Sequence, residues 1–295
     1  MAESIEPVVL AAVDGSPAAL NAVRWAAREA SLRHLPLRLV HVCALPPASS
    51  TALEGGGLVE SRLEQGYRWL GEARGQAHAA EPGIEIHTRL RTGAAAAALI
   101  EEAATARVAV LGSRGLGGFP GLLLGSVSSA LATHGPCPAV VVRDVLPPER
   151  GPVVVGVDAS ASSDAAIAFA FDTASRRQAP LVALHTWTDM SLGETWSVLP
   201  IDVDYAEVAE DERRLLAERL AGWREKYPDV PLALRTVRDR PVRGLLAAAR
   251  GAQLVVVGSR GRHALGGIGL GSTSQALLHH CACPVAVVRR ELPEE

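Results

Sequence analysis

Lysine is almost absent from this chain of 295 residues. Lys226 is the only lysine among 29 lysine and arginine residues. A phosphate-binding loop of the GxxxxGK[ST] type needs a lysine directly beside its glycines, and Lys226 lies near none of the glycine-rich segments. The shortage of lysine therefore excludes that nucleotide-binding motif.

Cysteines, aromatic residues and long apolar runs are also scarce. Four cysteines are too few for a disulfide scaffold. No apolar run reaches the roughly 18 residues that a membrane span requires. The net charge of -3 arises from interleaved acids and arginines, which leaves no basic stripe for nucleic acid. The acidic start, Met1 to Pro7, lacks the features of a secretory signal. We therefore expect a soluble, cytoplasmic protein that binds neither nucleic acid nor membranes.

The chain contains an internal duplication. Residues 13–16 read Val-Asp-Gly-Ser and recur 144 positions later as Val-Asp-Ala-Ser. Residues 112–115 read Gly-Ser-Arg-Gly and recur unchanged 146 positions later. This period is far too long for a solenoid and indicates a duplicated domain. Prolines and glycines interrupt structure over 144–152, so the predicted domains are 1–146 and 151–295.

Strand and helix signals alternate within each copy. An apolar run over 8–13 predicts the first strand, and Ser16-Pro17 then predicts a helix start with serine as N-cap and proline at the first helical position. Strands alternating with helices predict a parallel sheet with helices on both faces. The same reasoning predicts further strands over 37–42, 84–90, 107–111 and 138–143, and helices over 58–80, 94–105 and 126–133.

A glycine loop follows the fourth predicted strand of each copy. Residues 112–115 are followed by nine residues and then by Gly125-Ser126 at a predicted helix start, and the second copy keeps this spacing. Glycine lets backbone N–H groups turn toward one point, and the helix start adds free N–H groups and its positive dipole end. These features suit a polyphosphate. A GxGxxG motif does not fit, because Pro120 occupies its last glycine position.

The spacing G-x-x-G-x9-G-[ST] resembles the ATP-binding signature of universal stress proteins. A first strand that ends in Val-Asp-Gly-Ser and a second that ends in His-Val are similar to that family too. The resemblance covers essentially the whole chain twice, as in the tandem two-domain form found in actinobacteria. It implies an α/β fold: two tandem copies of an open five-stranded parallel sheet, order 3-2-1-4-5. Strand 1 would then lie beside strand 4, at a topological switch point where such sheets bind ligands.

The resemblance also implies binding residues. In the first copy, Ala12 and Asp14 would lie along the nucleoside and the backbone of Val42 would read the adenine edge. The loop residues would wrap the ribose and phosphates: Gly112, Ser113, Arg114, Gly115, Leu116, Gly117, Gly118 and Gly125. Ser126, Val127 and Ser128 would hold the distal phosphates.

The second copy has matching positions. Gly156, Asp158 and Thr186 replace Ala12, Asp14 and Val42. The matching loop and helix-start residues are Gly258, Ser259, Arg260, Gly261, Arg262, His263, Ala264, Gly271, Ser272, Thr273 and Ser274. Arg262 and His263 add cationic groups that the first loop body lacks, so the two sites are expected to differ in affinity.

Each of these features has a simpler alternative. Asp14 and Asp158 could be helix-capping or turn residues, and the glycines could be ordinary turn residues. The histidines at 41 and 185 recur at a strand end, which a repeated fold position explains more simply than acid–base catalysis. The segment 279–283, His-His-Cys-Ala-Cys, invites a metal interpretation. Its spacing is wrong for structural zinc, and a small buried residue explains Cys283 better.

The leading hypothesis is a regulatory, stress-response protein that binds ATP at one site per domain, with accompanying Mg²⁺ left open. Its output would be a nucleotide-dependent conformation or a contact with a regulatory protein partner, and whole chains are expected to form a homodimer. No catalytic residue and no metal ligand is assigned. The alternatives are a slow ATPase or an ATP-using transferase of the same topology, and an interaction module that binds no nucleotide.

Overall fold

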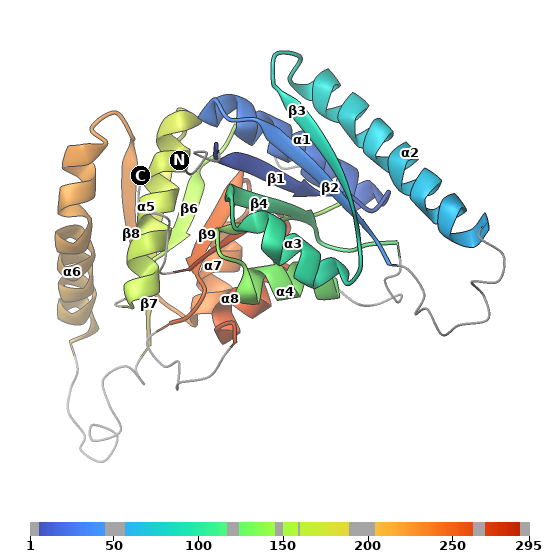
Figure 1. The fold of residues 1–295 in the computed structure, drawn as a ribbon. Helices are drawn as coiled ribbons and strands as arrows, with labels where there is room; N and C mark the ends of the chain where they lie inside the picture. Colours follow the sequence, from blue (N-terminus) through green and yellow to red (C-terminus); the bar gives the residue numbers. More distant parts are fainter. Residues whose placement is uncertain are drawn as a thin grey trace, which may run out of the picture. The chain divides into compact units, whose positions relative to one another are not determined.

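The computed structural model describes residues 6–44, 57–116, 124–144, 150–158, 160–188, 204–261 and 269–289. The chain divides into two compact units, Met1–Leu146 and Pro147–Arg290, here called the first and second domain. Each domain alternates strands with helices, which is the α/β architecture that the sequence predicts (Figure 1).

All strands of the first domain form one parallel sheet. Strand β1 lies between β2 and β4, β3 pairs with the outer side of β2, and β5 pairs with β4. The resulting order, β3-β2-β1-β4-β5, is the one that the family resemblance implies. The sheet's central strands are almost continuous runs of buried apolar residues, as expected for a sheet covered on both faces. The strands are β1 (Val8–Ala12), β2 (Leu37–Cys43), β3 (Ile86–Thr92), β4 (Ala106–Gly112) and β5 (Ala139–Val142).

Two helices cover each face of this sheet. α1 (Pro17–Arg33) packs with α2 (Gly57–Ala80), whereas α3 (Ala95–Ala103) packs with α4 (Ser126–His134) (Figure 1). The predicted start of α1 is confirmed: Ser16 is the N-cap, and its side-chain oxygen accepts a hydrogen bond of 3.1 Å from the backbone N–H of Ala19. Pro17 is the first helical residue.

The second domain repeats this order. Strand β6 pairs with β7 and β9, β8 pairs with β7, and β10 pairs with β9, all in parallel. Ser160 caps α5 as Ser16 caps α1. The strands are β6 (Val153–Gly156), β7 (Leu181–Trp187), β8 (Leu232–Arg238), β9 (Leu254–Gly258) and β10 (Val285–Val288). The helices are α5 (Ala161–Arg176), α6 (Tyr205–Lys226), α7 (Pro241–Ala248) and α8 (Ser272–His280).

No helix within the described residues combines the length and the hydropathy of a membrane span. The longest helices, α2 and α6, are amphipathic: α6 buries Leu216 and Leu220 and exposes most of its charged residues.

Candidate functional site

The carboxyl ends of β1 and β4 bring Asp14 and Gly115 together. The two strands are neighbours in the sheet, so the segments that leave them start side by side. A Cβ atom at Gly115 would overlap the Asp14 carboxylate oxygen Oδ2. The loop backbone therefore lies directly against this carboxylate, and any larger residue at position 115 would force the carboxylate to shift.

Asp14 also shapes the turn that leads into α1. Its Oδ1 accepts a hydrogen bond of 3.0 Å from the backbone N–H of Ser16, while Ser16 itself caps the helix. Asp14 is thus a turn residue, as the simpler interpretation holds, but the turn uses only one of its two carboxylate oxygens. The second oxygen faces the loop at Gly115.

Gly112 and Ser113 anchor the start of the loop. A Cβ atom at Gly112 would come within 2.7 Å of the Ala18 backbone, so this glycine permits close packing of β4 against α1. The backbone N–H of Ser113 donates to the carbonyl of Val142, and its own carbonyl accepts from Gly125 at 2.7 Å. The Ser113 hydroxyl is buried and has no hydrogen-bond partner among the described residues.

The first turn of α4 presents free backbone donors. Its N-cap is Gly125, and no side chain caps the helix. The Ser128 hydroxyl donates to the carbonyl oxygen of Gly112 at 2.7 Å, which ties the helix start to the end of β4. Ser126 is exposed to solvent. A helix start with uncapped N–H groups beside a glycine loop is suited to an anion.

Arg114 contacts residues outside the glycine loop. Its guanidinium forms a salt bridge with Asp144, and its carbonyl oxygen accepts a hydrogen bond of 3.2 Å from the Ser16 hydroxyl. Leu116 follows with 59% of its surface exposed. Gly117 and Gly118 of the predicted site lie outside the described residues.

Half-buried apolar residues of β1, β2, α3 and α4 pack together and are here called the apolar floor. Four half-buried side chains pack against one core cluster of the first domain: Ala12, Val42, Ile100 and Val127. Three of these residues belong to the predicted site. The side chain of Val127 contributes to the floor, although the resemblance placed this residue at the phosphates.

The second domain builds the same arrangement with different residues. Asp158 Oδ1 accepts hydrogen bonds from both the backbone N–H and the hydroxyl of Ser160. A Cβ atom at Gly261 would lie 3.0 Å from Asp158 Oδ2, so the contact is looser than at Gly115. Gly258 lies against the Ser162 backbone, much as Gly112 lies against Ala18.

The start of α8 repeats the start of α4. The Ser274 hydroxyl donates to the Gly258 carbonyl at 2.6 Å, and the Gly271 N–H donates to the Ser259 carbonyl at 2.8 Å. No side chain caps α8, whose first two residues are Ser272 and Thr273. The Arg260 carbonyl accepts from the Ser162 hydroxyl. Arg262, His263 and Ala264 lie outside the described residues.

The repeated histidines support the turns before the two aspartates. His41 Nδ1 lies 2.7 Å from the Val13 carbonyl oxygen, and His185 Nδ1 lies 2.8 Å from the Val157 carbonyl oxygen. Both imidazoles are largely buried. This shared contact fits the interpretation of the histidines as repeated fold positions.

Trp69 of α2 lies beside the turn that contains Asp14. Its indole ring lies against the Cα of Gly15, where any Cβ would overlap it, and Gly15 has a φ of 80°. The ring also meets His41 edge-on, with the ring centroids 5.1 Å apart. Glycine at position 15 adopts the positive φ and leaves room for the ring, whereas no sequence feature pointed to Trp69 as the neighbour.

All four cysteines are buried, as the small-residue interpretation of Cys137 and Cys283 predicts. Burial raises the pKa of Cys137 to about 12. A hydrogen bond with Cys281, together with burial, raises the pKa of Cys283, and the two sulfur atoms lie 3.5 Å apart. Within the described part of the chain, no three His, Cys, Asp or Glu side chains are grouped as metal ligands.

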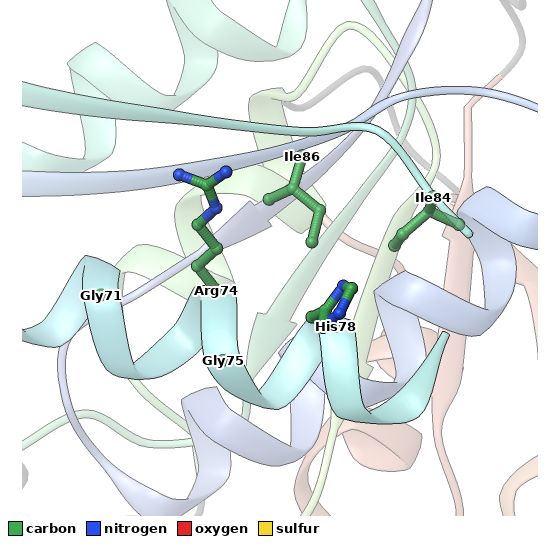
Figure 2. Close-up of a pocket in the computed structure, with 6 residues that line it drawn as sticks. All are labelled: Gly71, Arg74, Gly75, His78, Ile84 and Ile86. Atoms are coloured by element: carbon green, nitrogen blue, oxygen red, sulfur yellow. The ribbon is translucent and has the colours of Figure 1, made fainter. Parts of the chain in front are cut away.

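A separate pocket of about 410 Å³ opens between α2 and β3 (Figure 2). Arg74 and His78 flank it, the open surface of Gly71 and Gly75 forms one side, and Ile84 and Ile86 form the other. These residues come from the second half of α2, from the connection that follows it and from the first residue of β3. The pocket therefore lies toward the amino end of β3, away from Asp14 and the glycine loop at the carboxyl ends of the strands.

Comparison with known proteins places these features in a family. A family model described as "Universal stress protein family" matches residues 7–143 and again 149–289. The universal stress protein Rv2623 of Mycobacterium tuberculosis is 41% identical over 296 residues, covering 96% of this chain and 97% of that protein. A universal stress protein of Mycolicibacterium smegmatis is 40% identical over 292 residues, covering 95% and 96% respectively. The crystal structure of a universal stress protein from Archaeoglobus fulgidus covers 98% of this chain and 100% of its own, with a TM-score of 0.71 and 19% identity.

Proposed function

The chain belongs to the universal stress protein family, and we propose that each of its domains binds one adenine nucleotide at the carboxyl end of its sheet. The observation that carries this proposal is the contact between a glycine loop and a carboxylate, Gly115 with Asp14 and Gly261 with Asp158. Each contact lies at the topological switch point of its sheet, which is between β1 and β4 in the first domain and between β6 and β9 in the second.

The described residues fit a nucleotide. The uncapped first turns of α4 and α8 offer backbone N–H groups to the phosphates. The buried Ser113 hydroxyl, which lacks a partner among the described residues, supplies a further donor at the loop. The apolar floor of Ala12, Val42 and Ile100 is suited to one face of a base.

The proposed roles follow from chemistry. Asp14 and Asp158 accept hydrogen bonds from the nucleoside hydroxyls, since an ionised carboxylate only accepts. The backbone of Val42 and of Thr186 contacts the base edge, and the two glycine loops surround the phosphates. The nucleotide itself supplies the negative charge that the helix starts of α4 and α8 stabilise.

We propose binding rather than turnover as the activity. Asp14 and Asp158 are the carboxylates beside the glycines, and in the proposed roles each holds its own turn and the nucleoside hydroxyls rather than a water. We expect ATP hydrolysis far below the typical enzyme turnover of about 10 s⁻¹. The output is then a cytoplasmic, nucleotide-dependent contact with a regulatory protein or with a second copy of the chain.

The direct test is the nucleotide content of freshly purified protein. Heat-denatured samples should release adenine nucleotide, up to two per chain, identified by chromatography and mass spectrometry. A metal-dependent hydrolysis rate near 10 s⁻¹ that loop substitutions abolish would replace the binding proposal with an enzymatic one. Protein that releases no nucleotide and gives no binding heat with ATP and Mg²⁺ would contradict both.

A further inference from the structure

The pocket between α2 and β3 combines two basic side chains with an apolar wall. Arg74 and His78 flank its volume of about 410 Å³, which is within the range of small-molecule sites. Figure 2 shows both side chains leaving α2 on the side of Ile84 and Ile86, which form the opposite wall. The pocket therefore offers hydrogen-bond donors and apolar surface to the same occupant.

The protein does not neutralise these two basic side chains. Arg74 and His78 form no hydrogen bond or ion pair with another described residue. The pocket lining, all of which belongs to the described residues, contains no carboxylate. Glu85 lies between the two isoleucines in sequence, but it pairs with His87 at 3.1 Å. Because Arg74 and His78 are one helical turn apart, they repel each other whenever the imidazole is protonated, and a bound anion relieves that repulsion.

One side of the pocket is open because α2 carries Gly71 and Gly75. A Cβ atom at either position would meet nothing within 4 Å, so packing does not require these glycines. Glycine is also disfavoured in a helix interior relative to alanine, and the second domain has Ala217 and Ala221 at the equivalent positions of α6. The two glycines therefore keep space open beside Arg74 without contributing to the stability of the helix.

The second domain has a different residue at the arginine position. Pro82 and Pro228, which are 146 positions apart like the glycine loops, align the ends of the two helices. This alignment places Leu220, which is fully buried, where the first domain has Arg74. A core leucine cannot bind an anion, so the basic pocket is a feature of the first domain alone.

We propose that this pocket binds one small amphipathic monocarboxylate, an aryl or short alkyl acid. Arg74 offers a guanidinium fork to the carboxylate, and His78 offers a ring N–H in either protonation state. Ile84 and Ile86 contact the apolar part of the ligand. A phosphate dianion fits less well, because His78 lies in the last turn of α2, where the helix dipole is negative. This site is separate from the proposed nucleotide sites and does not depend on them.

Fluorine NMR titration of the full chain with 4-fluorobenzoate tests this inference. We expect saturable binding of one molecule per chain, with a Kd of about 1 mM or tighter. The uncharged 4-fluorobenzamide should bind about tenfold more weakly or worse, because it loses the charge-assisted hydrogen bonds. Excess ATP should leave the benzoate bound. Absence of binding, equal binding of acid and amide, or displacement by ATP would overturn the inference, as would inorganic phosphate that binds more tightly than the benzoate.

Variants of α2 locate the bound probe. Arg74→Gln should weaken 4-fluorobenzoate binding about tenfold or more. Gly71→Leu fills the open space and should also weaken binding, without lowering the melting temperature measured by circular dichroism, since leucine favours a helix more than glycine does.

Arg68→Gln is the matched control, because it removes the same charge from an exposed position of α2 outside the pocket lining. This variant should bind 4-fluorobenzoate as the unmodified chain does. An Arg68→Gln effect as large as that of Arg74→Gln would overturn the inference, and so would unchanged binding in the folded Arg74 and Gly71 variants.

Discussion

The carboxylate of Glu212 lies 3.0 Å from the Nε2 atom of His185. The other ring nitrogen of His185 is 2.8 Å from the Val157 carbonyl oxygen, so both of its neighbours are acceptors. At the equivalent position of the first domain, Gly66 takes the place of Glu212, and a Cβ there would come within 2.7 Å of the His41 ring. Helix α6 is therefore bonded to β7 through side chains, whereas α2 packs directly against its histidine.

Glu212→Ala should destabilise the second domain. The substitution leaves the nearly buried Nε2 of His185 without its acceptor, which costs about 1–3 kcal/mol. Glu212→Gln keeps an acceptor oxygen and should lower the stability of the second domain less than Glu212→Ala does. Hydrogen exchange of α6 and β7 amides measures the effect, with Glu218→Ala, an exposed position on the same helix, as control. Exchange in α6 that is equally fast in the Glu218 and Glu212 variants would contradict this role.

Glu102→Ala should destabilise the first domain more strongly than Glu212→Ala destabilises the second. The Glu102 side chain is 3% exposed and accepts from three guanidiniums, those of Arg38, Arg89 and Arg91. Burial, together with the charge of Arg89, already lowers the pKa of Arg38. Removing the carboxylate leaves Arg38 enclosed without its counter-charge, at a cost of about 3–5 kcal/mol in urea unfolding.

The duplication supplies the control for this prediction. The second domain has Val182 and Ala248 where the first has Arg38 and Glu102. Arg38→Val combined with Glu102→Ala should therefore recover much of the stability lost by Glu102→Ala alone. If the double variant is as unstable as the sum of the two single variants, the buried charge is not the cause.

Cys137 should react with thiol reagents only after unfolding. Its folded pKa of about 12, raised by burial, exceeds the value near 8.5 for a free thiol, so the native state favours the protonated form. This contribution to stability is fully present below about pH 8.5 and is lost as the pH rises toward 12. In native protein at pH 8, Cys137 should be labelled by a thiol reagent no faster than the protein unfolds. The Cys137→Ser variant identifies this thiol, because it should lose one labelled cysteine. Rapid labelling of Cys137 in native protein would contradict the burial argument.

Gly115→Ala should weaken nucleotide binding more than Gly261→Ala does. A methyl group at Gly115 overlaps the Asp14 carboxylate, whereas at Gly261 it lies 3.0 Å from Asp158 and a small shift relieves it. A displaced carboxylate that loses one hydrogen bond to the nucleoside costs about tenfold in affinity. Gly75→Ala is the control, because a Cβ there meets nothing within 4 Å. Equal effects of the two loop substitutions would contradict the tighter contact at Gly115.

Much of the fold could be predicted because both copies carry the same signals. The order of strands and helices follows from periodicity, and Ser16-Pro17 predicts the start of α1 correctly. The third strand was placed too early, over 84–90, because Ile84 and Ile86 alternate with polar residues. The strand begins at Ile86, because Ile86 is the first residue in register with β2, opposite Leu37.

The positions of the loop and of the strand ends could be predicted from the sequence, but the contacts of individual side chains could not. The strand order implied by the family resemblance put Asp14 and the glycine loop at one crevice, and the structure places Gly115 in contact with Asp14. The packing of Ile100 beside the other residues of the apolar floor could not be predicted, because Ile100 lies in an alanine-rich helix whose facing residues are known only once β2 and α4 are placed. Gly112 was assigned to the ligand, yet its close packing against Ala18 already accounts for the glycine.

Calorimetric titration of nucleotide-free protein with ATP and Mg²⁺ tests the central claim most directly. The account predicts saturable binding at two sites per chain, one at each loop–carboxylate contact. It also predicts that Asp14→Ala combined with Asp158→Ala weakens both sites by about tenfold or more, one hydrogen bond each. Absence of binding in the unmodified chain, or affinities that the double variant leaves unchanged, would contradict it.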